Sequence, residues 1–157
     1  MNPLVIVPTY NERNNVSPLL KKLRALQLPL EILFVDDNSP DGTGKLLDEF
    51  AAGQDTLHIL HRPSKEGIGA AHLAGLAWAE ERGHTCVVTM DCDLTHSPED
   101  IPDLLAAAET ADVVVGSRYL QQGSLEGWNW RRKLLTHLAH TLTRTLLALP
   151  YDSTGAF

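Results

Sequence analysis

The sequence predicts an α/β protein with a mainly parallel central sheet. Through the first 117 residues, short apolar runs alternate with longer amphipathic stretches, as strands and helices do in a parallel sheet covered on both faces. Polar residues also gather directly after four of the apolar runs, at the sheet edge where such folds bind ligands. Hydrophobic residues make up 43% of the 157 residues, which is enough for one buried core.

Each expected strand is short, apolar and often β-branched, as buried parallel strands are. The expected strands are residues 4–8, 31–36, 57–61, 85–91 and 112–116. Amphipathic stretches lie between them and predict helices at residues 16–26, 44–52, 68–82 and 98–110. Right-handed crossovers would bring the carboxyl ends of the strands to one edge of the sheet.

The formal net charge of −7 is unevenly distributed. Residues 118–148 hold five basic side chains against one acidic side chain, whereas the first 117 residues are strongly acidic. This distribution suggests an acidic, metal-binding part and a basic segment that faces an anion or a membrane. It argues against broad nucleic-acid binding, which favours a basic domain.

The expected compartment is the cytosol or the cytosolic face of a membrane. We see no secretory leader, and no apolar run approaches the ~20 residues of a membrane span. The two cysteines, Cys86 and Cys92, are expected to be small buried residues rather than a disulfide or a zinc site.

The segment Asp91-Cys92-Asp93 is the sharpest chemical signal. Residues i and i+2 at a strand end point the same way, so the two carboxylates would repel each other unless a cation sat between them. A divalent ion with oxygen ligands fits, and diphosphate oxygens would complete its shell. We therefore expect Mg²⁺ or Mn²⁺ at Asp91 and Asp93. The alternative is that both are solvated turn residues ahead of the next helix.

Polar residues follow the other strands as well. A carboxylate of Asp36-Asp37 can accept hydrogen bonds from a base or a ribose hydroxyl, although the residues after it also have the composition of a turn. Gly67 and Gly69 open the third expected helix, where backbone N–H groups suit a phosphate, but a simple helix start explains them better. Arg118 follows the fifth expected strand. A lone arginine there is more often a surface residue, but this one would face the same edge as the aspartates, where a guanidinium suits phosphate oxygens.

A long amphipathic pattern begins after Trp128 and Trp130. Three cationic residues follow, and then an apolar stripe formed by Leu134, Leu138, Leu142 and Leu146. The pattern is typical both of an interfacial helix that contacts a membrane and of a helix that packs on the sheet. Peripheral membrane contact therefore remains one of two interpretations.

Together these motifs resemble glycosyltransferase family 2, and within it the polyprenol (dolichol) phosphate mannose synthases. The residues that carry the resemblance are 7–12, 36–43, 67–69, 90–94, 116–119, 127–136 and 152–157. The resemblance implies the type-A glycosyltransferase fold, a Rossmann-like nucleotide-binding α/β domain. It also implies a single domain, shortened at its C-terminus relative to the family. Residues 1–117 would form the nucleotide-sugar-binding core, and residues 118–157 an acceptor-side segment with the amphipathic helix.

The resemblance further assigns roles to individual residues. Nucleotide-sugar contacts fall on Pro8, Tyr10, Glu12, Val35, Asp37, Asp91, Cys92, Asp93 and Arg118. The implied metal ligands are Asp91 and Asp93, with Asp93 the principal one. The acceptor phosphate would be held by Arg118, Arg132 and Thr136, and the implied catalytic residues are Asp93, Arg118 and Arg132. Cys92 stands where relatives usually have alanine, and Thr136 where they have serine.

The implied reaction moves a hexose, expected to be mannose from GDP-mannose, to a polyprenyl or dolichyl phosphate with inversion at the anomeric carbon. A phosphate monoester has its second pKa near ~6, so it is already an anionic nucleophile at neutral pH and needs cations more than a general base. Two alternatives remain open. One is a UDP-sugar-dependent transferase acting on undecaprenyl phosphate or a glycan, and the other is a catalytically silent nucleotide-binding fragment.

Overall fold

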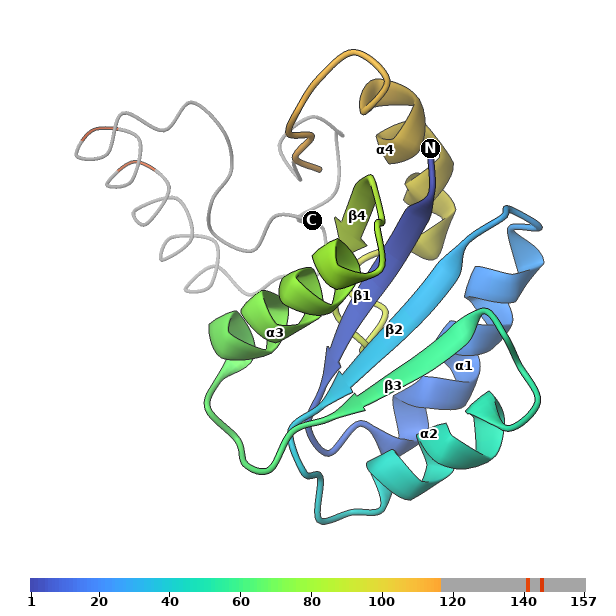
Figure 1. The fold of residues 1–157 in the computed structure, drawn as a ribbon, viewed down its shortest axis with the longest axis vertical. Coiled ribbons are helices and arrows are strands. Elements are labelled where there is room, and N and C mark those ends of the chain that lie inside the picture. The colour runs from blue at the N-terminus through green and yellow to red at the C-terminus, as the bar shows by residue number, and fades with distance from the viewer. Residues whose placement is uncertain (117–140, 142–144, 146–157) are drawn as a thin grey trace. The chain divides into compact units, whose positions relative to one another are not determined.

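The computed structural model describes residues 1–116, 141 and 145. The chain divides into two compact units, Met1–Asp103 and Leu104–Phe157. In the described residues of the first unit, four parallel strands form one sheet (Figure 1). They are β1 (Pro3–Thr9), β2 (Glu31–Asp36), β3 (Leu57–His61) and β4 (Cys86–Thr89). The expected division between residues 117 and 118 stays a prediction.

The strand order is β3-β2-β1-β4, so the direction of strand addition reverses at β1. The chain first builds outward from β1 to β2 and β3, and then returns to place β4 on the other side of β1. Parallel register pairs Ile6 of β1 with Leu33 of β2 and with Thr89 of β4. In doubly wound sheets, the crevice at such a reversal is where ligands bind.

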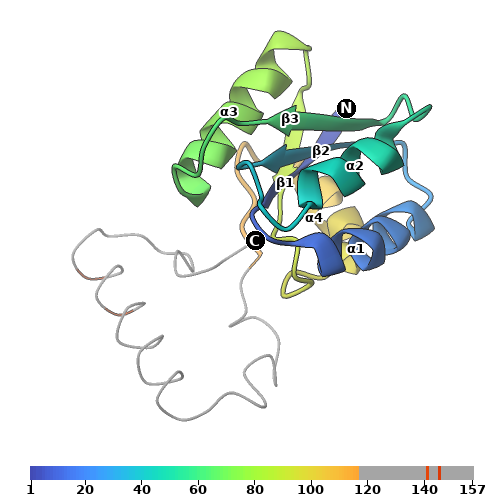
Figure 2. The ribbon, with the colours of Figure 1, turned by 90° about the horizontal axis from the view of Figure 1, so that it is seen from below.

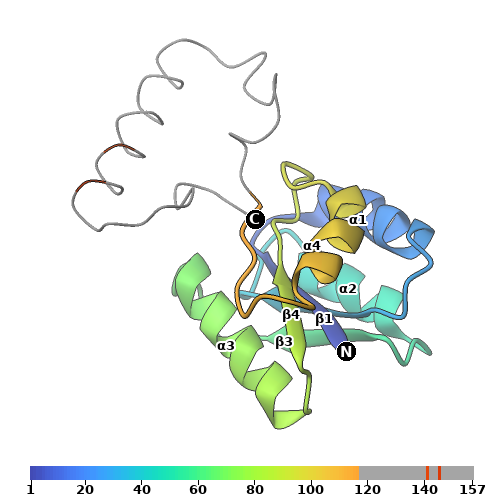
Figure 3. The ribbon, with the colours of Figure 1, turned by 90° about the horizontal axis from the view of Figure 1, so that it is seen from above.

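Helices cover both faces of this sheet (Figures 2 and 3). The helices α1 (Arg13–Ala25) and α2 (Thr43–Ala51) lie on one face, and α3 (Ile68–Glu81) lies on the other. This arrangement follows from right-handed crossovers, because the connection from β3 back to β4 runs in the opposite direction across the sheet. A short 3₁₀ turn, η1 (Pro98–Asp100), contacts α1 and leads into α4 (Ile101–Ala107).

The core lies on both sides of β1, whose central residues are fully buried. Alternate strand residues face opposite sides of a sheet. One side forms a cluster with α3 that consists of Leu4, Ile6, Leu33, Val35, Ala71 and Ala79. The buried stripe of α1 consists of Val16, Leu19, Leu20 and Leu23, at the spacing of one helical face. The sheet is therefore rigidly supported beneath the edge where its strands end.

Gly75 allows α3 to approach the sheet closely. An alanine Cβ at this position would lie 2.8 Å from Ile6 Cγ2 and 3.4 Å from Val35 Cγ2. We expect Gly75→Ala to lower the free energy of unfolding by roughly 1–3 kcal/mol through overpacking, as measured by urea denaturation. Gly69→Ala in the same helix is the matched control, because nothing lies within 4 Å of its added Cβ. The control should gain up to about 1 kcal/mol from helix propensity, and an equal gain at Gly75 would contradict the close contact.

The prediction of a fifth strand at residues 112–116 is wrong, and all five residues lie within the described part of the chain. Residues 112–116 have no strand conformation, and Val113 is 77% exposed. Three consecutive valines favour an extended chain, but a strand forms only where a neighbour supplies its hydrogen bonds. The sequence pattern contains no information about that neighbour.

Element boundaries also differ from expectation, most importantly at the fourth strand and the fourth helix. The fourth strand ends at Thr89, so Asp91 lies beyond the strand rather than inside it. The expected helix at residues 98–110 is split into η1 and α4 and ends at Ala107. Pro102 accounts for the split, because it lacks the N–H that would bond to the carbonyl of Pro98 in a continuous α-helix.

Of the expected amphipathic helix, Thr141 and Thr145 lie within the described residues. Both are helical, and the Thr145 hydroxyl donates a 2.7 Å hydrogen bond to the carbonyl of Thr141. None of the helices in the described part of the chain combines the length and apolar character of a membrane span.

Candidate functional site

A pocket of about 290 Å³ lies at the reversal of strand order in the first unit. Its walls come from the ends of β1 and β2, the loop before α3, and the turn after β4. The lining residues are Pro8, Thr9, Tyr10, Glu12, Asp37, Lys65, Gly67, Ile68, Ala71, Asp91, Cys92 and Asp93. The carboxyl ends of parallel strands thus meet as expected, and they bring residues together from widely separated parts of the sequence.

The segment after β1 forms one wall and begins α1. Asn11 adopts a left-handed conformation with φ of 62°, which turns the chain sharply after Tyr10. The amide of Glu12 donates to the Thr43 hydroxyl at 3.0 Å, and its carboxylate accepts a 2.6 Å hydrogen bond from Asn15. These contacts fix Glu12 at the pocket wall before any ligand binds.

The two aspartates after β2 have different tasks. Asp36 is 2% exposed and accepts hydrogen bonds from the Thr9 hydroxyl at 3.1 Å, the Ser39 hydroxyl at 2.6 Å and the Ser39 amide at 3.1 Å. Three donors satisfy this buried carboxylate, which therefore joins the ends of β1 and β2. Asp37 is also buried, but it lines the pocket. The structure thus separates a structural aspartate from one that can meet a ligand.

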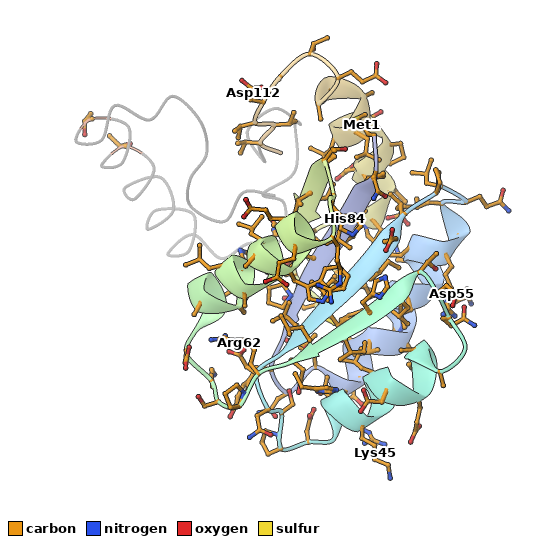
Figure 4. The ribbon with its side chains drawn as sticks, in the orientation of Figure 1. Met1, Lys45, Asp55, Arg62, His84 and Asp112 are labelled. Carbon is orange, nitrogen blue, oxygen red and sulfur yellow. The ribbon has the colours of Figure 1, made fainter. Side chains whose placement is uncertain are left out.

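Arg62 is an important residue that the sequence analysis missed. Its Nη1 donates a 2.7 Å hydrogen bond to Asp37 Oδ1, with the two side chains only 10% and 6% exposed. Figure 4 shows Arg62 where β3 ends. Parallel pairing places the end of β3 beside the end of β2. The signal that could have predicted this ion pair is a basic residue directly after one strand, Arg62, and an acidic residue directly after the neighbouring strand, Asp37.

The turn after β4 presents Asp91 and Asp93 around a buried Cys92. Leu94 has a φ of 64°, and this left-handed residue turns the chain back after Asp93. Asp93 Oδ1 accepts hydrogen bonds from the Thr95 hydroxyl at 2.6 Å and the Thr95 amide at 2.9 Å. Partial burial alone would raise the pKa of Asp93, but these hydrogen bonds bring it below its usual value. Asp93 is therefore a carboxylate at neutral pH.

Cys92 is suited to packing rather than to metal binding. It is 2% exposed, and burial together with the nearby carboxylates of Glu12, Asp93 and Asp91 raises the pKa of its thiol to about 12. A thiol binds metal as the thiolate, which this environment disfavours. The donors that the turn offers are therefore carboxylate oxygens.

The pocket suits a hard divalent cation bound together with an anionic ligand. Among the described residues, four carboxylates line it against one ammonium group, and Arg62 pairs with one of the four, Asp37. A diphosphate would therefore be repelled without an added positive charge. Among the described residues, no group of three or more acidic, histidine or cysteine side chains is arranged to hold a metal by itself. Two carboxylates would leave most of an octahedral shell for water and phosphate oxygens, as is usual for Mg²⁺.

Most of the predicted nucleotide-sugar residues meet in this pocket. They are Pro8, Tyr10, Glu12, Asp37, Asp91, Cys92 and Asp93. Val35 is different, because its side chain is fully buried in the core beneath α3 and does not line the pocket. The predicted residues Arg118, Arg132 and Thr136 lie outside the described residues.

Comparison with solved structures defines the class of the fold. The mannosyltransferase PcManGT from Pyrobaculum calidifontis, solved in complex with GDP-Man and Mn²⁺, superimposes with a TM-score of 0.61 at 25% sequence identity. The match covers 74% of this chain and 34% of that protein. Together with the all-parallel sheet, this similarity gives the chain the type-A glycosyltransferase fold.

The chain belongs to glycosyltransferase family 2, because the family model described as "Glycosyl transferase family 2" matches residues 4–155. It is 47% identical to the polyprenol monophosphomannose synthase of Mycolicibacterium smegmatis, over 98% of this chain and 59% of that protein. It is 42% identical to the undecaprenyl-phosphate mannosyltransferase of Micrococcus luteus, over 95% of this chain and 61% of that protein. The chain thus spans about three fifths of the length of these two relatives.

Proposed function

We propose that this chain is the donor-binding part of an inverting, metal-dependent glycosyltransferase that moves mannose from GDP-mannose to a polyprenyl phosphate. The observation that carries the proposal is the convergence of Asp37, Asp91 and Asp93 on one pocket at the reversal of strand order. The choice of mannose and of a polyprenyl phosphate is supported by the names of the two relatives that share 47% and 42% of their aligned residues with the chain.

In this proposal each side of the pocket has a separate task. Asp37, aligned by Arg62, accepts hydrogen bonds from the nucleoside. Asp91 and Asp93 hold Mg²⁺ or Mn²⁺, and the metal supplies positive charge that stabilises the leaving diphosphate. The acceptor phosphate is anionic at neutral pH, so it needs orientation more than deprotonation. We assign its binding to Arg118, Arg132 and Thr136. Because the proposed acceptor is a lipid, the reaction would take place close to a membrane surface.

Thermal unfolding in the presence of GDP or UDP, each with and without Mn²⁺, tests this proposal. A ligand at about 100 times its dissociation constant stabilises a protein by about 2.7 kcal/mol. For a chain of this size that corresponds to a rise in Tm of roughly 5–10 °C. We expect a rise only when Mn²⁺ is present, and a larger rise with GDP than with UDP.

The other outcomes separate the alternatives. A larger rise with UDP would favour a UDP-sugar-dependent transferase, and equal rises with and without Mn²⁺ would contradict the metal site. No rise with either nucleotide would contradict donor binding by this chain.

A further inference from the structure

Lys65 is the one cationic side chain among the described residues that line the pocket. It lies in the loop between β3 and α3, which is fastened to the end of β2 by backbone and side-chain hydrogen bonds. The amide of Arg62 donates to the carbonyl of Asp36 at 2.8 Å, and Asn38 Nδ2 donates to the carbonyl of Pro63 at 3.1 Å. The loop therefore has a fixed starting point from which Lys65 reaches across the pocket.

The ammonium group of Lys65 rests on an aromatic ring. Its Nζ lies 3.8 Å from the centre of the Tyr10 ring, which belongs to the segment after β1. Within the described residues it forms no ion pair, although Glu12, Asp37, Asp91 and Asp93 line the same pocket. A cation–π contact at an exposed site is weak compared with a charge-assisted hydrogen bond to phosphate. The contact with Tyr10 can therefore keep the ammonium inside the pocket and still release it to a stronger anionic partner.

We propose that Lys65 binds the diphosphate of the nucleotide-sugar donor and leaves the Tyr10 ring when the donor enters. This inference rests on the proposed function and adds a phosphate-binding residue that the sequence analysis did not identify. Arg62 already pairs with Asp37, but Glu12, Asp91 and Asp93 also line the pocket, so a second positive charge beside the metal would help to offset these carboxylates and the diphosphate.

The test compares ligands that share a nucleoside but differ in phosphate. Binding of guanosine and of GDP is measured by calorimetry in the presence of Mn²⁺, for the wild type and for Lys65→Met. Loss of one charge-assisted hydrogen bond should weaken GDP binding by about tenfold to a hundredfold, while guanosine binding stays unchanged. Lys65→Arg keeps the charge and should retain most of the affinity for GDP.

Lys45→Met is the matched control. Lys45 is an exposed residue of α2 (Figure 4) that does not line the pocket, and its replacement makes the same change in net charge. It should leave the affinity for GDP unchanged.

Different outcomes overturn different proposals. Equal binding of GDP to the wild type and to Lys65→Met would overturn the role of Lys65 and leave the proposed function standing. An equal loss of guanosine and GDP binding would assign Lys65 to the nucleoside or to the shape of the pocket instead. If the wild type bound no nucleoside diphosphate, the proposed function and the role of Lys65 would both be wrong.

Discussion

Replacement of Asp93 with asparagine is expected to abolish the stabilisation by GDP and Mn²⁺ while leaving the stability of the free protein nearly unchanged. Asparagine keeps an oxygen that can accept the hydrogen bonds from Thr95, but it removes the negative charge. Loss of an outer-shell partner typically costs roughly 10–100-fold in metal affinity, and loss of a direct ligand should cost more. Thermal unfolding with GDP, with and without Mn²⁺, measures both effects.

Asp55→Asn provides the matched control for this variant. Asp55 is exposed and lies before β3, at the end of that strand opposite to Arg62 (Figure 4). The substitution makes the same change in charge without touching the pocket lining. If Asp93→Asn behaved like this control, the metal site would have to lie elsewhere in the protein.

Replacement of Arg62 with methionine should cause the largest loss of stability among the variants considered. The guanidinium pairs with Asp37 at 2.7 Å where both side chains are almost inaccessible to water. Removal of one partner of a buried pair leaves an uncompensated charge, which typically costs about 3–5 kcal/mol. The second contact of Arg62, with the 59% exposed Glu66, should contribute little by comparison. Urea denaturation measures the change in the free energy of unfolding.

A double variant separates the charge effect from the loss of packing. Arg62→Met combined with Asp37→Asn removes both charges and should recover part of the lost stability. Arg82→Met is the control, because Arg82 is 48% exposed and its ion pair is with the 75% exposed Glu81. A loss at Arg62 no larger than the loss at Arg82 would rule out an important buried pair.

The strands of the first unit could be predicted because the residues of each strand carry the pattern of a strand themselves. The central run of β1 is apolar at every position, which is the pattern of a strand buried on both faces, and a polar turn follows it. Residues 112–116 have a similar apolar composition but form no described strand. A strand also needs a neighbouring strand to supply its hydrogen bonds, and the residues of a segment do not show whether the fold provides one.

The site was predictable where one short motif carries the chemistry, and less so where distant residues meet. Asp91 and Asp93 stand two residues apart, so one short segment was enough to predict that they share a site, and both line the pocket. Arg62 contacts Asp37, which lies 25 positions earlier in the chain, and Lys65 contacts Tyr10, which lies 55 positions earlier. Neither contact can be predicted without knowing which strands are neighbours. The fully buried Val35 shows the opposite case, because a residue beside the site in sequence can point into the core.

The order of the pocket residues along the chain has a consequence for synthesis. Every described residue that lines the pocket lies between Pro8 and Asp93. Translation adds about 5–20 residues per second and domains tend to fold as units from the N-terminus, so these walls are made before the basic segment of residues 118–148. If the pocket binds a nucleotide as proposed, the ligand would stabilise the sheet while the basic segment, residues 118–148, is still being made.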